Sequence, residues 1–326
     1  MKISSFTKAL PLAAALLLSL GMAAQPQPTK VVRLYPQGQD TDCGIIENGV
    51  QITHGPGESN GLTGAEEGKE LWRVQNVGDN ARMLLYLPPK NTSGQMVIVC
   101  PGGGYAMLST GTEGACVAEW LMSEGIAACV LVYRMPNGHD TVPLQDVQNA
   151  FRYCRSHAEE WGVKQIGVMG FSAGGHLAAT ASTMFADDVT RPDFSILIYP
   201  VISFEDGVTS KGSTRRLLTG EDSSKYEKYT LYRHVGENTP PTMLVLSADD
   251  ASVPPENSFR YFDSLAQHGI TREMYVFPHG GHGWGFTTAK YAKDGKDPLD
   301  DSYRALFFNA MDNFLYNMSL EITSGK

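Results

Sequence analysis

The chain has 326 residues and a formal net charge of −9, because 35 acidic side chains outnumber 26 lysines and arginines. This acidic balance, without a cluster of basic residues, argues against a nucleic acid or an anionic membrane surface as partner. The length allows one large domain. The five cysteines are an odd number, so we expect mostly free thiols, although one disulfide is compatible with that count.

The first 24 residues have the pattern of a secretory signal peptide. Lys2 and Lys8 supply positive charge, residues 9–20 form an apolar stretch, and residues 21–24 are small at the expected cleavage point. The apolar stretch is too short for an ordinary membrane span, and no cysteine near the cleavage point could carry a lipid. We therefore expect a periplasmic or secreted protein without a membrane anchor.

Residues 25–68 follow as a glycine-rich N-terminal segment. The segment contains one strand candidate, residues 31–35, and a stretch at 55–68 whose Gly, Pro, Asn and Glu content is typical of a loop. We expect the main domain to occupy residues 69–326.

In the main domain, apolar runs alternate with helical patterns. The apolar runs are nearly continuous, as in strands that helices cover on both faces. Strands are expected at 82–87, 96–100, 126–133, 166–169, 194–199, 242–246 and 272–277, and helices at 112–123, 143–158, 173–185, 255–267 and 299–318. A polar stretch at about 202–240 interrupts the alternation and is expected to form a small cap insertion. The pattern predicts the α/β class, with a doubly wound, mainly parallel sheet.

A nucleophile elbow is predicted around Ser172. The segment 170–176 reads GFSAGGH, follows a strand candidate and opens a helix candidate. In a strand–turn–helix of the G-x-S-x-G type, the serine hydroxyl is exposed above the sheet and the helix N-terminus faces any developing negative charge. The bare pattern is short enough to occur by chance, so the neighbouring motifs decide its meaning.

Three further motifs directly follow strand candidates. They are PGGGY at 101–105, DDASVP at 249–254 and HGGHGWG at 279–285. The first stands where α/β-hydrolases carry a glycine-rich oxyanion loop, with Pro101 in place of the usual histidine. The order of serine, aspartate and histidine along the chain is that of the α/β-hydrolase fold and of neither major serine-protease class. We therefore predict an α/β-hydrolase.

Ser172, Asp250 and His282 are the predicted catalytic residues. A serine hydroxyl is a poor nucleophile until a base removes its proton, and a histidine can accept that proton and return it to the leaving group. A carboxylate on the far ring nitrogen holds the histidine in the required tautomer.

The backbone N–H groups of Gly103, Gly104 and Ala173 are the predicted oxyanion hole. Glycine in the loop lets the backbone approach the substrate without an intervening β-carbon. Tyr105 and Trp284 adjoin the motifs and are predicted to bind substrate, although a packing role for either ring is an open alternative.

Other polar residues have structural interpretations. His279 and His282 could form a metal pair, but no further ligand stands at a suitable spacing, so no metal and no cofactor are expected. His176 is expected to be structural, Arg134 to form a structural ion pair and Asp146 to be solvated or locally paired.

The GFSAGGH segment, the PGGGY loop, the VPPENS run at 253–258 and GGHGWG at 280–285 together resemble bacterial acetyl esterases and acetylxylan esterases. These are α/β-hydrolases of the hormone-sensitive-lipase-like branch, and the resemblance covers about residues 82–318. Pro101 agrees with the acetyl-esterase branch. Loops of the family read Gly-x-x-Asp-x-x-Val-Pro, which implies Asp250 rather than Asp249 as the acid.

The resemblance implies a secreted serine carboxylesterase that removes acetyl or other short acyl groups from carbohydrate such as xylan or xylo-oligosaccharides, through an acyl-enzyme. The expected partner is a small-molecule or oligosaccharide ester. Two alternatives stay open at this point: a serine peptidase of the prolyl-oligopeptidase type, and a non-catalytic carbohydrate-binding protein on a hydrolase scaffold. Such peptidases usually carry a large propeller domain, for which the chain leaves no room.

Overall fold

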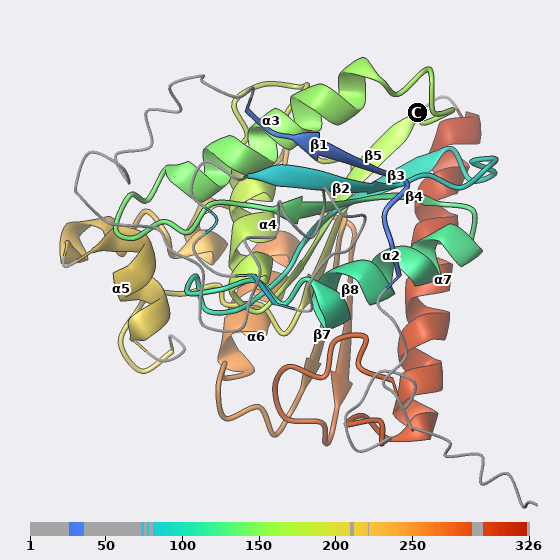
Figure 1. Ribbon diagram of the computed structural model, residues 1–326. Coiled ribbons are helices and arrows are strands. Elements are labelled where there is room, and N and C mark those ends of the chain that lie inside the picture. Colours follow the sequence, from blue (N-terminus) through green and yellow to red (C-terminus); the bar gives the residue numbers. More distant parts are fainter. Residues whose placement is uncertain are drawn as a thin grey trace, which may run out of the picture.

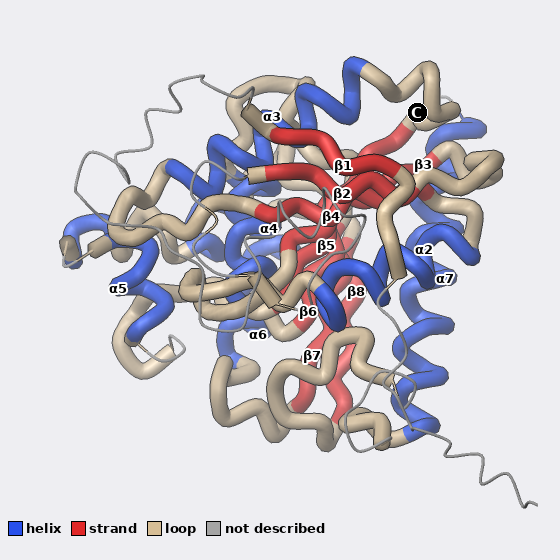
Figure 2. The backbone as a smooth tube through the Cα atoms, viewed as in Figure 1, coloured by secondary structure: helices blue, strands red, loops and turns tan. Residues whose placement is uncertain are grey.

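An eight-stranded, mainly parallel β-sheet runs through the centre of the molecule (Figures 1 and 2). The computed structural model describes residues 26–35, 73, 74, 77, 81–208, 212–220, 222–288 and 296–324. The predicted signal peptide and most of the glycine-rich segment lie outside the described residues, as does Cys43.

The strand order in the sheet is β1-β2-β4-β3-β5-β6-β7-β8. The strands are β1 (Lys30–Arg33), β2 (Arg82–Tyr86), β3 (Gln95–Cys100), β4 (Ala127–Val132), β5 (Gln165–Phe171), β6 (Ser195–Ile198), β7 (Thr242–Ser247) and β8 (Arg272–Phe277). Only the β1–β2 and β2–β4 pairs are antiparallel. The order and the parallel core confirm the predicted doubly wound α/β-hydrolase fold.

Helices cover both faces of this sheet, which explains the continuous apolar strands. The helices are α2 (Cys116–Ser123), α3 (Val142–Ser156), α4 (Ala173–Thr183), α5 (Ser213–Thr219), α6 (Glu256–Gln267) and α7 (Asp301–Ser324). Figure 1 shows α2 and α7 on one face and α3, α4 and α6 on the other. Every residue of β2 to β7 is buried, whereas the edge strands β1 and β8 are partly exposed.

Strand β1 corrects the predicted domain boundary. It lies within the segment 25–68, which was set apart from the main domain, yet it pairs antiparallel with β2 from Lys30 opposite Leu85 to Arg33 opposite Arg82. The hydrolase sheet therefore begins well before residue 69. The sequence indicated a strand at 31–35, but not that it joins the main sheet, because a short strand far ahead of the next one has no neighbouring helix to show the α/β alternation.

The register of the parallel strands brings their carboxyl ends together. Cys100 at the end of β3 pairs with Gly170 near the end of β5, and Phe171 pairs with Ile198 at the end of β6. Ser247, at the end of β7, pairs with Phe277 of β8. Loops that follow these strands leave the sheet at one edge, where open α/β sheets bind their ligands.

The segment between β6 and β7 forms the expected interruption of the α/β alternation. It contains α5 and two short 3₁₀ helices, η3 (Ser223–Lys225) and η4 (Leu231–His234). Helix α5 stands away from the sheet in Figure 1. We call residues 202–240 the cap segment.

Four cysteines, Cys100, Cys116, Cys129 and Cys154, are buried and free. For these four, the expectation of free structural thiols is confirmed. Among the described residues, no helix combines the length and the apolar character needed to cross a membrane.

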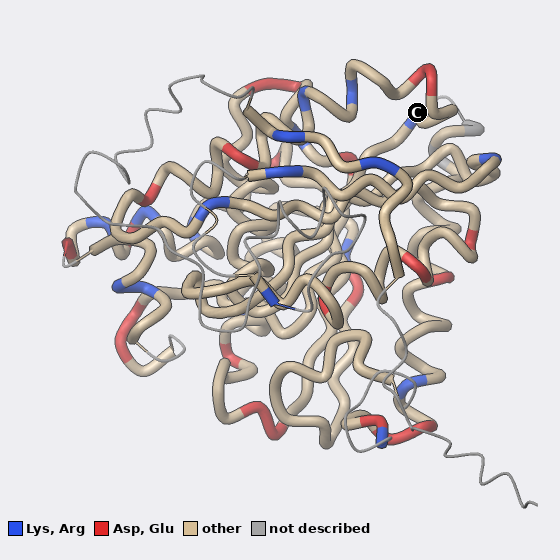
Figure 3. Tube along the Cα trace, in the orientation of Figure 1, with Lys and Arg blue, Asp and Glu red and all other residues tan. Residues whose placement is uncertain are grey.

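Charged residues of both signs are scattered over many elements in the view of Figure 3. Some charged residues are buried, and two of them form an ion pair: Arg134, after β4, and Asp146 on α3, whose side chains are both fully buried. The carboxylate accepts from the Arg134 backbone N–H at 2.8 Å, from the guanidinium at 2.6 Å and from the Tyr35 hydroxyl at 2.7 Å. The pair therefore joins the segments that follow β1 and β4 to α3, and the structural ion pair predicted for Arg134 is present.

Replacing Asp146→Asn should lower the free energy of unfolding by about 3–5 kcal/mol, because it removes the buried carboxylate with which the buried guanidinium pairs. Urea denaturation of the purified variant measures this change. Arg152→Gln is the matched control: it breaks the exposed Arg152–Asp187 pair and should change stability little. An Asp146→Asn protein as stable as the parent would show that the pair does not fasten α3.

Candidate active site

Ser172, His282 and Asp250 form a continuous chain of hydrogen bonds at the carboxyl edge of the sheet. The distance from Ser172 Oγ to His282 Nε2 is 2.8 Å, and His282 Nδ1 lies 2.6 Å from Asp250 Oδ2. The three side chains come from the loops after β5, β8 and β7, over more than 100 residues of sequence. The structure thus brings together the three residues that the motifs singled out.

Ser172 occupies a strained turn between β5 and α4. Its backbone has φ 53° and ψ −119°, a region that side-chain-bearing residues rarely adopt. Gly174, two residues later, has no space for a side chain, since a β-carbon there would lie 2.1 Å from the Cys100 carbonyl oxygen. The elbow therefore requires glycine two residues after the serine, because its backbone packs directly on the end of β3.

Residues 101–105, which we call the glycine loop, follow β3 and lie beside the elbow. Gly103 has φ +136°, and a β-carbon on it would lie 2.1 Å from the Met107 carbonyl oxygen. Its own carbonyl accepts from Ala106 and Met107, which closes the loop. The N–H groups of Gly103 and Gly104 donate to no other group among the described residues, and both glycines line the same pocket as Ser172.

Residues 249–254 form the acid loop after β7, in which the two neighbouring aspartates point in different directions. Asp250 is buried and accepts from the backbone N–H groups of Ser252 at 2.8 Å and Val253 at 2.9 Å, which holds its carboxylate toward His282. Asp249 points elsewhere, accepts from the Gly281 N–H at 2.8 Å and is 44% exposed. That hydrogen bond lowers the pKa of Asp249. Asp249 therefore stabilises residues 279–285, which we call the histidine loop, through the loop's backbone rather than through His282 itself.

Tyr105 and Trp284 do not reach the pocket. Both side chains are 1% exposed. The Tyr105 hydroxyl bonds to His176 Nδ1 at 3.0 Å, and Trp284 Nε1 donates to Ser247 Oγ at 3.0 Å. The prediction that these two rings contact the substrate is therefore wrong, because the loops that carry them turn the rings into the core.

His176 has the structural position expected of it, whereas His279 lies at the surface. His176 is fully buried, stacks on Phe204 of the cap segment with ring centroids 4.7 Å apart, and has its pKa lowered to about 4 by burial. His279 is exposed, with its Nδ1 3.7 Å from Asp249 Oδ2. Within the described ranges, no group of three or more His, Cys, Asp or Glu side chains is arranged to hold a metal ion.

The pocket above Ser172 has a volume of about 350 Å³. Most of its lining residues are small or polar. Besides Ser172 and His282 they are Arg73, Gly103, Gly104, Ser109, Glu113, Ser213, Thr214, Ser252, Val253 and Gly283. Sequence reasoning missed Arg73 and Glu113, because neither belongs to a motif and each becomes a neighbour of Ser172 only through the fold. Ser213 and Thr214 show that α5 of the cap segment forms one wall.

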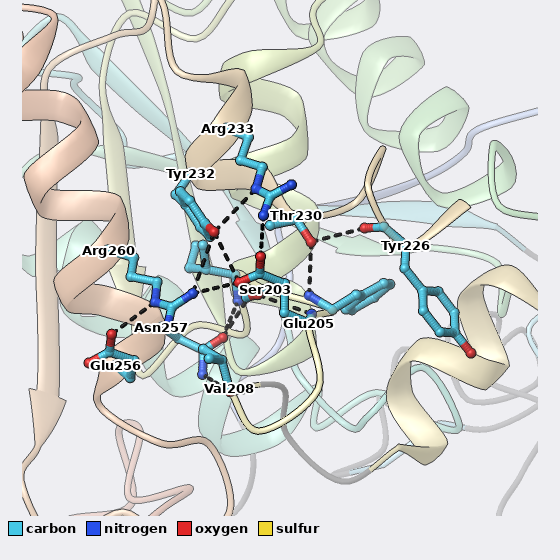
Figure 4. Close-up of polar contacts among 12 residues, drawn as sticks. Ser203, Glu205, Val208, Tyr226, Thr230, Tyr232, Arg233, Glu256, Asn257 and Arg260 are labelled. Atoms are coloured by element: carbon cyan, nitrogen blue, oxygen red, sulfur yellow. Dashed lines mark hydrogen bonds and ion pairs between the residues drawn. The ribbon is translucent and has the colours of Figure 1, made fainter. Parts of the chain in front are cut away.

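The cap segment is tied to the acid loop through α6. Asn257 of α6 accepts from the Ile202 and Ser203 N–H groups at 3.0 Å each, and its amide donates to the carbonyls of Val208 and Pro254 at 2.8 and 2.9 Å. Next to it, Glu205 accepts hydrogen bonds from groups on η4 and α6 (Figure 4). These donors are Tyr232, Arg233 and Arg260. The base of the cap segment is thus held in place beside the pocket.

In a comparison with protein families, the BD-FAE family model aligns with residues 83–265. An acetylxylan esterase of Xylanibacter ruminicola is 40% identical over 222 residues, covering 65% of this chain and 46% of that protein. Endo-1,4-beta-xylanase B of Butyrivibrio fibrisolvens is 33% identical over 218 residues, covering 62% of this chain and 34% of that protein. The chain therefore spans less than half the length of either relative.

Solved structures with the same fold include two hydrolases. An acetyl ester-xyloside bifunctional hydrolase from Caldicellulosiruptor lactoaceticus superposes with a TM-score of 0.64 at 28% identity, covering 89% of this chain and 98% of that chain. A carboxylesterase from Lactobacillus plantarum superposes with a TM-score of 0.62 at 25% identity, covering 72% of this chain and 93% of that chain.

Asp250→Asn should slow the hydrolysis of an activated aryl acetate greatly, approaching the ~10⁴-fold loss that follows when a triad aspartate becomes an amide. Asp249→Asn should cost far less, because the amide oxygen can still accept from Gly281. Steady-state kinetics on the two purified variants measure this difference, with circular dichroism to show that both are folded. The reverse order of losses would contradict the assignment of Asp250.

Proposed function

The chain belongs to the BD-FAE family and has the α/β-hydrolase fold, and from this premise we propose that it is a serine esterase that removes acetyl and other short acyl groups from carbohydrate. The observation that carries the proposal is the hydrogen-bonded chain from Ser172 through His282 to Asp250. Beside it lie Gly103 and Gly104, whose N–H groups have no acceptor in the described part of the chain. The names of the relatives support a xylan-derived substrate, either the polymer or its oligosaccharides.

Acylation starts at the Ser172 hydroxyl. His282 Nε2, 2.8 Å away, takes the proton as Ser172 Oγ bonds to the ester carbonyl carbon. Asp250 holds the proton on Nδ1 and stabilises the imidazolium that forms. His282 then gives its proton to the departing sugar oxygen, and the acyl group stays on Ser172.

The tetrahedral intermediate places negative charge on the former carbonyl oxygen. The N–H groups of Gly103, Gly104 and Ala173 are the proposed donors to that oxygen, and each such donor is typically worth ~3–4 kcal/mol in the transition state. Water attacks the acyl-enzyme by the same route in reverse, with His282 as base, and releases the carboxylic acid.

Ester hydrolysis is better supported than peptide hydrolysis or a non-catalytic role. The relatives that the chain resembles are named as esterases and xylan-degrading enzymes, which favours ester over peptide hydrolysis. The assembled serine, histidine and aspartate argue against a non-catalytic scaffold. Export from the cytoplasm stays a prediction that rests on residues 1–24 alone.

Incubation with acetylated xylo-oligosaccharides should release acetate, and Ser172→Ala should abolish this release, with a loss of up to about 10⁶-fold. Ser156→Ala, an exposed serine on α3, is the matched control and should retain full activity. Release should also persist after exhaustive chelation. Cleavage of peptide amides without acetate release would favour the peptidase alternative, and undiminished turnover in Ser172→Ala would overturn the mechanism.

Acetate esters should be turned over faster than octanoate esters. The pocket is small, and Val253 is its one large apolar lining residue within the described part of the chain, so little apolar surface is available to hold a long acyl chain. A series of p-nitrophenyl esters of increasing chain length measures kcat/KM directly. A maximum at eight carbons or more would point to a lipase.

A further inference from the structure

Glu113 is a buried carboxylate in the pocket wall that the proposed mechanism does not use. It lies on a short π-helical segment, η2 (Gly111–Ala115), and its residue exposure is 5%. Single π-helical turns are uncommon and occur frequently at functional sites. An ionisable side chain in such a place has a desolvation cost that must be offset by specific partners.

One carboxylate oxygen of Glu113 holds the glycine loop. Oε2 accepts from the Gly102 N–H at 2.8 Å, and the Gly102 carbonyl in turn accepts from Ser109 at 2.9 Å. Gly102 directly precedes the two glycines whose N–H groups are the proposed oxyanion donors. The hydrogen bond from Gly102 to Glu113 therefore fixes the orientation of the peptide group that precedes these two glycines.

The other carboxylate oxygen holds the residue that packs against the base. Oε1 accepts from the Tyr199 hydroxyl at 2.8 Å, and the Tyr199 ring lies 4.8 Å from the His282 ring, centroid to centroid. Tyr199 follows β6 with φ 37°, a left-handed conformation that persists in a tyrosine only when its surroundings impose it. The hydrogen bond to Glu113 is one such constraint.

The histidine loop meets the same carboxylate from a third side. A β-carbon on Gly285 would lie 3.1 Å from Glu113 Cγ and 3.0 Å from the Tyr199 hydroxyl. The Phe286 N–H donates to the carbonyl of Thr112, next to Glu113, at 3.1 Å. Glu113 therefore stands where the glycine loop, the end of β6 and the histidine loop come together.

Resting on the proposed esterase function, we propose that Glu113 is a positioning residue: its carboxylate holds the glycine loop through Gly102 and the packing of His282 through Tyr199. The nucleophile, the oxyanion donors and the base then keep their relative positions while the substrate binds and leaves. When it is ionised, the carboxylate also favours the imidazolium form of His282, which arises when the proton leaves Ser172.

The charges around Glu113 are consistent with this second effect. Burial raises the pKa of Glu113, while the hydrogen bonds from Tyr199 and Gly102, the charge that His282 carries when protonated and the charge of Arg73 act to lower it. The interaction with His282 is reciprocal, so an ionised Glu113 makes the protonated histidine easier to form. Tyr133, which donates to the Pro101 carbonyl, is a further titratable neighbour, and its pKa is raised by burial and by Glu113 among other groups. Arg304 donates to the Gly285 carbonyl at 2.6 Å and supplies a positive charge near Tyr199.

Three variants separate positioning from simple packing. Glu113→Ala removes both hydrogen bonds and should lower kcat by on the order of 10²–10³-fold, the range for loss of an oxyanion donor, with KM little changed. Glu113→Gln keeps an oxygen for Gly102 and an amide for Tyr199, so it should retain most of kcat. Tyr199→Phe breaks one bond but leaves the buried carboxylate, and should lower kcat less than Glu113→Ala does.

The pH profile of kcat/KM for an activated aryl acetate tests the charge. In Glu113→Gln the acidic limb should move to lower pH, because the anion that favours the imidazolium is gone. Glu124→Gln, an exposed carboxylate just after α2, is the matched control and should leave kcat and the limb unchanged. Thermal unfolding of each variant identifies any loss caused by misfolding. If Glu113→Ala does not fold, Tyr199→Phe and Glu113→Gln still carry the test.

Wild-type kcat and an unmoved acidic limb in folded Glu113 variants would overturn the proposal. Equal losses in Glu113→Gln and Glu113→Ala, in parallel with falling Tm and with an unmoved limb, would also overturn it and leave a purely structural role. The rate at which a fluorophosphonate labels Ser172 compares the variants with the wild type in the same way. This rate does not depend on which acyl group or sugar the enzyme prefers. If the wild type is labelled but releases no acetate from carbohydrate, the substrate proposal fails while the Glu113 test still stands.

Discussion

The close contact between the turn after β5 and the loop after β3 is the constraint on which the site depends. A β-carbon on Gly174 would collide with the Cys100 carbonyl, so the backbone of the elbow packs directly on the end of the neighbouring strand. That contact places the Ser172 hydroxyl beside the glycine loop. The strained conformation of Ser172 persists because parallel pairing of β3 with β5, and of β5 with β6, holds both sides of the turn.

The sheet extends this local constraint to the other two residues of the triad. Parallel pairing from β5 through β6 and β7 to β8 brings the acid loop and the histidine loop to the same edge. Within each loop, backbone donors then select the orientation: Ser252 and Val253 aim Asp250, and Asp249 holds the loop that carries His282. Positions over 100 residues apart thus reach hydrogen-bonding distance without long side chains.

Sequence reasoning found the elements whose signal is local. The apolar runs predicted β2 to β8, and the motif spacing brought out Ser172, Asp250 and His282, because each lies just after a strand. It misjudged Tyr105 and Trp284, since adjacency to a motif does not tell which way a ring points. It missed Glu113, whose partners Tyr199 and Gly285 are 86 and 172 residues away (199 − 113 and 285 − 113) and are recognisable only in the folded chain.

Isolation of the covalent intermediate tests the central claim most directly. Rapid acid quenching during turnover of an acetyl ester, followed by peptide mass spectrometry, should find one acetyl group on the peptide that contains Ser172, and none there in Ser172→Ala. Acetylation of a different residue, or turnover in which no acyl-enzyme can be trapped even when deacylation is slowed in the Asp250→Asn protein, would contradict the account.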